Sequence, residues 1–182
     1  MPPTGTRRHD PHRRDRIIEA AVAVISEAGP AGLTHRAAAA RADVPLGSTT
    51  YHFTDLDELL DAAARTVAER NVQRLRDWAS ALPDDADLSE ELATFIVVLA
   101  TKHRQTSALA YELYGGALRR PALRAASTTW DAMLTEVFES RVDTITAKAL
   151  TALFDGLLYQ ALVSPRKPRR ADVEPVLRRL LG

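Results

Sequence analysis

The chain has 182 residues, with 24 Lys and Arg against 24 Asp and Glu, and no cysteine. This length is enough to bury a core without disulfides or metal, in one domain or in a domain with a small module beside it. The lack of cysteine excludes disulfide scaffolds, thiolate zinc sites, iron–sulfur clusters and thiol enzymes, and is compatible with a reducing compartment. A formal charge of zero means that any nucleic-acid-binding surface must be local.

Neither membrane insertion nor export is predicted. The longest nearly continuous apolar run, Phe95–Ala100, is far shorter than a membrane span. The Arg residues near the N-terminus are not followed by an apolar stretch of the secretory type. We therefore expect a cytoplasmic protein with no membrane partner.

The apolar pattern is helical almost throughout, so the expected fold class is all-α, with about nine helices. Residues 1–9 are expected to form a disordered arm. A first helix is expected to start at Asp10-Pro11, an acidic cap followed by proline in the first helical position, and to end at Gly29. Two short helices follow, over 35–41 and 45–52, and make a helix-turn-helix pattern.

The rest of the chain predicts a larger helical body. Asp55 starts a long helix that runs to about Leu82, and Asp87 with Glu90 starts the next, which contains the fully apolar run and should be buried. Further helices are expected over 105–119, 121–141, 143–163 and 171–181. The pattern divides the chain into a module of residues 1–53 and a body of residues 54–182.

The first module carries a recognisable set of residues at fixed spacing. These are Arg14–Ala21, Gly29, Gly32–Thr34, Gly47–Phe53, Asp55 and Leu59–Leu60. They resemble the N-terminal signature of the TetR family of transcriptional regulators. The resemblance implies a homodimeric DNA-binding regulator, usually a repressor, in which residues 1–53 bind DNA and residues 54–182 bind a small molecule and dimerise.

The expected recognition helix carries short polar side chains and an aromatic pair at its end. In a helix-turn-helix this second helix enters the major groove, where Ser and Thr hydroxyls reach bases or phosphates. Arg36 matches a family position that contacts a base, although a solvated salt bridge is the alternative, and Thr49 either contacts DNA or packs the module. The expected DNA-binding residues are Thr34, Arg36, Leu46, Gly47, Ser48, Thr49, Thr50, Tyr51 and His52.

Three positions depart from the family pattern. Thr50 stands where an aromatic residue is usual, Leu56 where lysine is usual, and Asp43 where the turn glycine is usual. With the neutral net charge, the departures at Thr50 and Leu56 leave open an alternative function, that of a helical small-molecule-binding protein that has lost DNA binding. An N-terminal basic cluster could compensate by reaching phosphates or a minor groove, or could be a solvated tail. Its members are Arg7, Arg8, Arg13, Arg14 and Arg16.

The last two expected helices, 143–163 and 171–181, have apolar faces that could form a four-helix bundle across a two-fold axis. The alternative is that they pack inside one chain. Two recognition helices related by this axis would read a palindrome with half-sites about one helical turn (~34–36 Å) apart. The expected dimerisation residues are Leu153, Gly156, Leu157, Gln160, Ala161, Val173, Val176, Leu177 and Leu180.

A ligand pocket is expected among the few aromatic residues of the body, with ordinary core packing as the alternative. The expected residues are Phe95, Leu99, His103, Tyr111, Tyr114, Trp130, Met133 and Phe154. Without Arg or Lys inside an apolar run, a neutral or aromatic-bearing ligand is favoured. The sequence shows no catalytic motif, metal-ligand pair or cofactor loop, so no enzyme, metal or cofactor is expected. The hypothesis is that the ligand shifts the long helix from Leu56 and so changes the separation of the two recognition helices.

Overall fold

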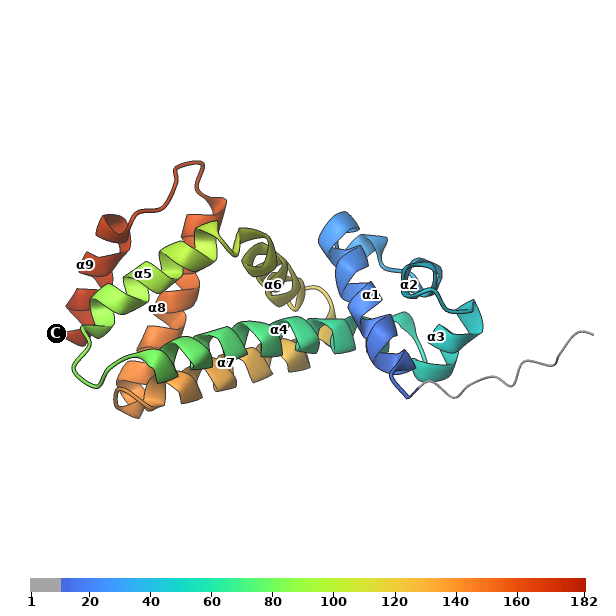
Figure 1. Ribbon diagram of the computed structural model, residues 1–182, viewed down its shortest axis with the longest axis horizontal. Coiled ribbons are helices and arrows are strands. Elements are labelled where there is room, and N and C mark those ends of the chain that lie inside the picture. The colour runs from blue at the N-terminus through green and yellow to red at the C-terminus, as the bar shows by residue number, and fades with distance from the viewer. Residues whose placement is uncertain (1–10) are drawn as a thin grey trace, which may run out of the picture. The chain divides into compact units, whose positions relative to one another are not determined.

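The computed structural model describes residues 11–182. Within them lie nine α-helices, two short 3-10 turns and no strand, which confirms the all-α fold (Figure 1). The arm expected at residues 1–9 and the expected cap Asp10 lie outside the described residues. The chain divides into two compact units, of which the first ends at Ala63 and the second is Ala64–Gly182.

The first unit contains α1 (Arg13–Ala28), α2 (His35–Ala42), α3 (Leu46–His52) and the start of α4 (Leu56–Ala81). Helix α1 begins at Arg13 rather than at Asp10-Pro11, because its first helical hydrogen bond runs from Arg16 N to His12 O. Pro11 and His12 form a turn before it.

Local capping chemistry fixes the ends of two helices in this unit. Thr34 caps α2 as expected, since its hydroxyl accepts a hydrogen bond of 3.0 Å from Ala37 N. At the start of α4, Asp55 accepts from Glu58 N at 2.8 Å, and the Glu58 carboxylate accepts from Thr54 N. Each side chain therefore satisfies a backbone donor that the helix cannot.

The core of the first unit is small and completely closed. Ile17 of α1 and Phe53, after α3, are 0% exposed, and Leu33 before α2 is buried as well. The Arg16 guanidinium donates to the carbonyls of Ala42 (2.9 Å) and Asp43 (3.4 Å). The first helix therefore holds the turn between α2 and α3 in place.

The second unit contains the rest of α4 and five further helices. These are α5 (Leu88–Thr101), α6 (Arg104–Gly116), α7 (Arg124–Glu139, after a 3-10 turn at Pro121–Leu123), α8 (Thr144–Val163) and α9 (Arg170–Leu181). Helix α9 lies along α5, and α8 contacts α5, α6, α7 and α9 (Figure 1). Ile96 of α5 and Leu150 of α8 are 0% exposed, so the apolar run in α5 is buried as expected.

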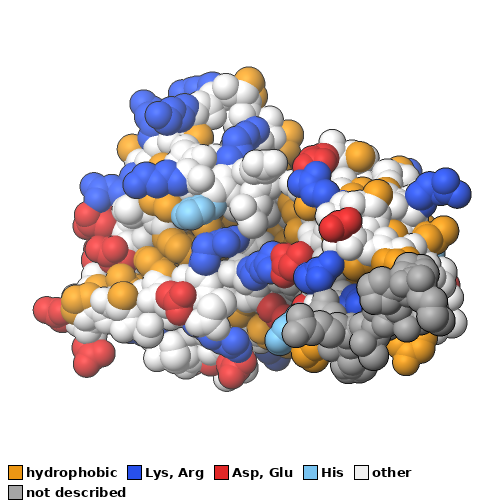
Figure 2. Space-filling model, turned by 45° about the vertical axis from the view of Figure 1, so that its right-hand side comes forward, with side chains coloured by type: hydrophobic (Ala, Val, Ile, Leu, Met, Phe, Trp, Pro, Cys, Tyr) orange, Lys and Arg blue, Asp and Glu red, His pale blue; other side chains and the backbone are white. Residues whose placement is uncertain are grey.

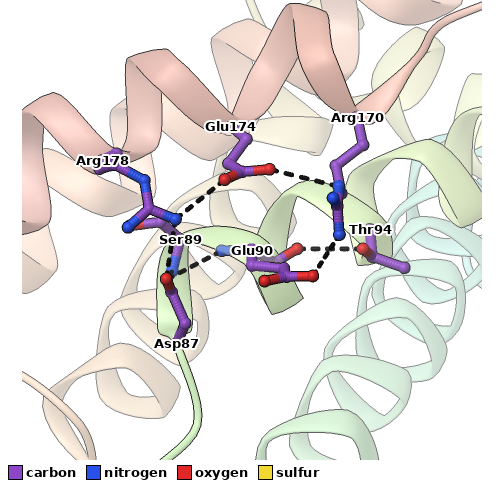
Figure 3. A network of polar contacts seen from close by, with 7 residues as sticks. All are labelled: Asp87, Ser89, Glu90, Thr94, Arg170, Glu174 and Arg178. Atoms are coloured by element: carbon purple, nitrogen blue, oxygen red, sulfur yellow. Dashed lines mark hydrogen bonds and ion pairs between the residues drawn. The ribbon is translucent and has the colours of Figure 1, made fainter.

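A polar network fastens α9 to the start of α5 (Figure 3). Arg178 donates to Asp87 at 2.7 Å and to Glu174 at 2.9 Å, while Arg170 pairs with Glu90 and Glu174. Asp87 also caps α5 by accepting from Ser89 N and Glu90 N. The Arg178 hydrogen bond, helped by the backbone donors, holds the pKa of Asp87 below its ordinary value. All these side chains are partly exposed, so their main effect is to fix the position of α9.

The zero net charge conceals a locally basic segment. Lys and Arg side chains gather over the connection between α8 and α9, at the top of the view in Figure 2. This connection contains Arg166, Lys167 and Arg169, all exposed. In the part of the chain that the structure describes, no helix is long and apolar enough to cross a membrane.

Candidate functional site

Helix α3 presents an exposed surface made of the residues expected to contact DNA. Tyr51 is 84% exposed and Leu46 45% exposed, and Thr50 also faces solvent. A Cβ atom at Gly47 would meet no atom within 4 Å, so the backbone there is open to close approach. Ser48 and His52 are half-buried, and the His52 ring meets the Tyr51 ring edge-on at 5.1 Å.

Thr49 lies on the opposite side of α3. Its side chain is 0% exposed, and its hydroxyl donates to Leu46 O at 2.8 Å. The structure therefore places Thr49 in the packing of the module, which was the alternative left open by the sequence.

Helix α2 contributes two further exposed positions. Thr34 and Arg36 both lie at its N-terminal end and face solvent. The Thr34 hydroxyl is already engaged in capping the helix. The unpaired amides of the first turn and the helix dipole favour an anion at this end. The Arg36 side chain can reach outward from the same end.

The family's usual turn glycine is replaced here by Asp43, which has φ 52° and ψ 53°. This is the left-handed region, which an L-residue adopts at a cost, although Asp tolerates it better than most. The backbone N–H of Asp43 closes α2 on the carbonyls of Ala39 and Ala40. The turn thus keeps its shape without glycine.

The basic cluster near the N-terminus divides into three parts. Arg7 and Arg8 lie outside the described residues. Arg16 is committed to the turn carbonyls, and the Arg14 guanidinium lies 5.1 Å from the centre of the Phe53 ring. At least two of the five arginines therefore stabilise the module.

Leu56, the departure from the usual lysine, is the half-buried first residue of α4.

The second unit contains two small, partly open cavities between its helices. The first, of about 20 Å³, lies between α4, α6 and α7, and the second, of about 10 Å³, is also walled by α5 and α8. Each has room for about one water molecule. Ala110 and Trp130 line both and therefore form the wall between them. The unit is nearly closed in this state.

Six of the eight residues expected in the ligand pocket line these cavities. Tyr114 lines the first, Trp130 lines both, and the second is also lined by Phe95, Leu99, Tyr111 and Phe154. The other two are elsewhere. His103 is exposed at the cap position of α6, and Met133 is half-buried against the core.

Two carboxylates that were not predicted from the sequence accept hydrogen bonds from the aromatic side chains that line the cavities. We call these side chains, Tyr111, Tyr114 and Trp130, the aromatic wall. The Tyr111 hydroxyl donates to Asp155 Oδ1 at 2.7 Å, and Trp130 Nε1 donates to the same atom at 3.4 Å. The Tyr114 hydroxyl donates to both oxygens of Asp131, at 3.0 and 3.3 Å. The signal was available for Asp155, because it is the one acidic residue in α8, a helix in which most residues are apolar.

Burial perturbs this cluster of titratable groups. Desolvation raises the pKa of Asp155 to about 6, against the lowering effect of its two hydrogen bonds, and the nearby Asp131 adds to the rise. Desolvation likewise raises the pKa of Asp131. The pKa of Tyr114 rises to about 12, first through burial and then through its bond to Asp131. Burial and Asp155 raise the pKa of Tyr111 further still.

The cavity lining also includes residues that were not anticipated. Apart from the six above, it consists of small and aliphatic side chains with two serines and one buried amide. These are Ala64, Val67, Ala68, Asn71, Leu75, Ser107, Ala110, Leu113, Leu123, Ala126, Ser127, Leu134 and Leu158. Their helical spacing is that of ordinary core residues, so no sequence pattern distinguishes them from the rest of the core.

The expected dimerisation residues fall into two groups. Ala161, Val173 and Leu177 are buried in the unit's own core, as the alternative reading allowed. The others remain accessible: Gln160 and Val176 are exposed, and Leu153, Gly156, Leu157 and Leu180 are half-buried.

An exposed apolar stripe continues this accessible surface along α8. Ile145 is 81% exposed, and Ala149, Ala152, Tyr159 and Val163 follow at helical spacing, all exposed. No atom lies within 4 Å of a Cβ added at Gly156. A continuous apolar face of this kind on a single chain is typical of an interface.

No group of three or more His, Asp or Glu able to hold a metal ion is found among residues 11–182. The polar groups that the structure does bring together, in the interior of the second unit, are phenols, an indole and carboxylates. They supply hydrogen bonds and negative charge.

Both parts of the chain match known families. Residues 17–63 match the family described as bacterial regulatory proteins, tetR family, and residues 83–182 match the tetracyclin repressor-like C-terminal domain.

Several relatives are similar over nearly the whole chain. The multidrug binding protein EbrR, solved with imidazole, is 44% identical, with 95% of this chain and 97% of that chain covered and a TM-score of 0.86. EbrR has also been solved with ethidium and with proflavin. The TetR family member SCO1917 from Streptomyces coelicolor A3 is also 44% identical, covering 94% and 99%, with a TM-score of 0.82.

A curated relative is more distant. The HTH-type nicotine-responsive transcriptional repressor HdnoR of Paenarthrobacter nicotinovorans is 25% identical over 184 residues, which is 88% of this chain and 89% of that protein.

Proposed function

Because the chain belongs to the TetR family of DNA-binding transcriptional regulators, which are not enzymes, we propose that it is a repressor that binds a palindromic operator as a homodimer. A small molecule that enters the second unit releases it from the operator. The observation that carries the proposal is the pairing of an exposed recognition helix, in the first unit, with a closed aromatic-lined interior in the second.

The proposed DNA contacts come from the exposed end of α2 and the exposed face of α3. Arg36 reads a base edge, since arginine to guanine is the commonest specific contact. Tyr51 and His52 bind phosphates, and Gly47 lets the backbone approach the groove. Leu46, Ser48, Thr50 and Thr34 complete the surface, and Thr49 supports it from below. The proposed DNA-binding domain is residues 1–53, and the ligand-binding and dimerisation domain is residues 54–182.

Dimerisation uses the apolar stripe of α8 with the neighbouring exposed part of α9. Ile145 and Val163 mark the two ends of the stripe, and Gly156 near its middle allows two helices to approach closely. Covering the stripe removes apolar area from water, which stabilises the dimer. The network of Arg178, Asp87 and Glu174 supports this surface by holding α9 in place.

The relatives support a ligand of small, ring-containing type. EbrR binds imidazole, ethidium and proflavin, and HdnoR responds to nicotine. A drug-sized ligand occupies several hundred Å³, on the order of 300 or more. The cavities offer about 20 and 10 Å³. The ligand must therefore push the walls apart to enter.

Because the walls of the cavities must move apart to admit a ligand, ligand binding is coupled to DNA binding. Helix α4 lines both cavities, through Ala64, Val67 and Ala68 in one and Asn71 and Leu75 in the other. The same continuous helix begins at Leu56 in the first unit. A ligand that displaces α4 changes the separation of the two recognition helices in the dimer. DNA affinity then falls by the ligand's preference for the open state.

DNA binding is tested with the intergenic DNA upstream of the protein's own gene in a mobility-shift assay. The wild type should bind one fragment specifically, Tyr51→Ala and Arg36→Ala should bind it at least about tenfold more weakly, and the charge-matched surface control Arg119→Ala should bind as the wild type does. Binding that ignores Tyr51 and Arg36, or no binding to any fragment at low salt, would favour a helical small-molecule-binding protein without DNA binding.

A further inference from the structure

The lining of the two cavities has no charge of its own. Every described lining residue is apolar or neutral and polar, and the polar atoms belong chiefly to Tyr111, Tyr114 and Trp130. All three rings direct their polar hydrogen onto a carboxylate: Tyr111 and Trp130 onto Asp155, and Tyr114 onto Asp131. The aromatic wall is thus backed by negative charge.

Among residues 11–182, no basic side chain donates a hydrogen bond to either carboxylate. The described hydrogen bonds of Asp155 come from the uncharged Tyr111 and Trp130, and those of Asp131 from Tyr114. The guanidinium of Arg74 on α4 donates a hydrogen bond to Asn71, which lines the second cavity. Burial and the neighbouring Arg70 lower the pKa of Arg74. Both carboxylates accept hydrogen bonds from the aromatic residues that line the cavities, whereas Arg74 bonds to the amide of Asn71.

A buried carboxylate without a cation is an unfavourable arrangement in the free protein. A positive charge brought within a few ångströms in this low-dielectric interior would be attracted far more strongly than in water. The ring faces add cation–π attraction, and donation to a carboxylate increases the electron density of those rings. A neutral ligand of the same shape would gain packing but would leave the carboxylate uncompensated.

Resting on the ligand-controlled function above, we propose that the ligand is a lipophilic aromatic cation held between Tyr111, Tyr114 and Trp130, with Asp155 as its principal counter-ion and Asp131 as a second. The ligand opens the wall that Trp130 and Ala110 form and merges the two cavities. The ethidium bound by EbrR has this chemistry, a flat ring system with a permanent positive charge.

The charge of Asp155 makes binding of a permanent cation dependent on pH. With a pKa of about 6, the carboxyl is ionised at pH 8 and only about one-tenth ionised at pH 5. The other titratable groups at this site are Asp131, Tyr111 and Tyr114, and both phenols keep their protons throughout this range. Affinity for the cation should therefore rise with pH between 5 and 8.

The test compares three probes of the same three-ring size by isothermal titration calorimetry on the full-length dimer at pH 8. N-methylphenanthridinium is a permanent cation, phenanthridine is neutral at this pH, and phenanthrene-9-carboxylate is an anion. The wild type should bind the cation at least about tenfold more tightly than the neutral probe, and the anion most weakly. At pH 5 the affinity for the permanent cation should fall about tenfold, because its own charge does not change with pH and only that of the carboxylates does.

The variants separate the counter-ion from general packing. Asp155→Asn keeps the size and the acceptor for Tyr111, and it should lose both the preference for the cation and its pH dependence. Asp131→Asn should weaken the preference in part. Glu136→Gln is the matched control, since it removes an exposed carboxylate from α7 that pairs with Arg76, and it should behave as the wild type. Circular dichroism melts of each variant show whether it is folded.

Each result decides between the two proposals. Equal affinity for the cation and the neutral probe, or a preference that survives in Asp155→Asn, would overturn the cation assignment and leave the ligand-controlled function standing. Failure of all three probes to bind the wild type would overturn the ligand site itself, and the cation assignment with it. Operator binding by the free protein is measured separately and does not depend on either result.

Discussion

Asp155→Asn should stabilise the free protein at pH 8 and leave its stability almost unchanged at pH 4. In the folded protein, burial raises the pKa of this carboxyl from the ordinary 3.8 to about 6. Such a rise corresponds to roughly 3 kcal/mol for ionising the group inside the fold. Between about pH 4 and pH 6, Asp155 is therefore protonated in the folded chain but ionised in the unfolded chain. The contribution of Asp155 to the free energy of unfolding falls as the pH rises through this window.

Asparagine carries no charge and avoids this cost. Its carbonyl can still accept from Tyr111 and Trp130, but its amide group needs an acceptor of its own, which offsets part of the gain. We expect a net stabilisation of about 2 kcal/mol at pH 8 and close to zero at pH 4.

Urea denaturation of the wild type and the variant at both pH values measures this difference. Some exposed carboxylates have lowered pKa values and act in the opposite direction, since their contribution to stability is lost as the pH falls. These are Asp87, Asp143 and Asp172. They are common to both proteins and cancel in the comparison. The same stability difference at pH 4 and pH 8 would refute a buried, costly charge at Asp155.

Three other substitutions test separate parts of the structure. Asp43→Gly should raise the free energy of unfolding by about 0.5–1 kcal/mol, because glycine adopts φ 52° without strain, and Asp43→Ala should lower it; urea denaturation distinguishes a relaxed turn from a specific role of the carboxylate. Gly156→Arg should convert the dimer to a folded monomer in light scattering after gel filtration, and a persistent dimer would show that α8 is not the interface. Arg178→Ala should lower the Tm only slightly, because Arg178 and Asp87 are exposed and Glu174 is partly so, and a large drop in Tm would mean that the α5–α9 contact depends mainly on this network.

Local chemistry made much of the fold predictable. The caps Thr34 and Asp87 stand where the sequence suggested, because a short polar side chain beside an apolar helical pattern has few other uses. The left-handed turn at Asp43 was implied by the family resemblance, because Asp43 stands where the turn glycine is usual. Helix limits were less accurate where two elements meet: the expected helix over 121–141 is a 3-10 turn followed by α7, which begins at Arg124.

The candidate sites were harder to predict, because they depend on tertiary contacts. Aromatic residues such as Tyr111 and Trp130 could be proposed for a pocket, yet their partner Asp155 comes from a different helix. A lone carboxylate in an apolar helix signals a buried polar contact but not its identity. For the same reason the burial of Thr49, which lies among other small polar residues, depends on how α3 packs and could not be predicted from the sequence.

The central claim is that a ligand in the second unit controls operator binding, and one measurement tests it most directly. The affinity for the fluorescently labelled operator is measured by anisotropy with and without saturating N-methylphenanthridinium, for the wild type and for Asp155→Asn. The account predicts that the ligand weakens operator binding by the wild type at least about fivefold. Asp155→Asn should need about tenfold more ligand for the same effect, whereas an equal response of both proteins would indicate that the ligand acts on the DNA itself. Unchanged operator affinity of the wild type at saturating ligand would contradict the account.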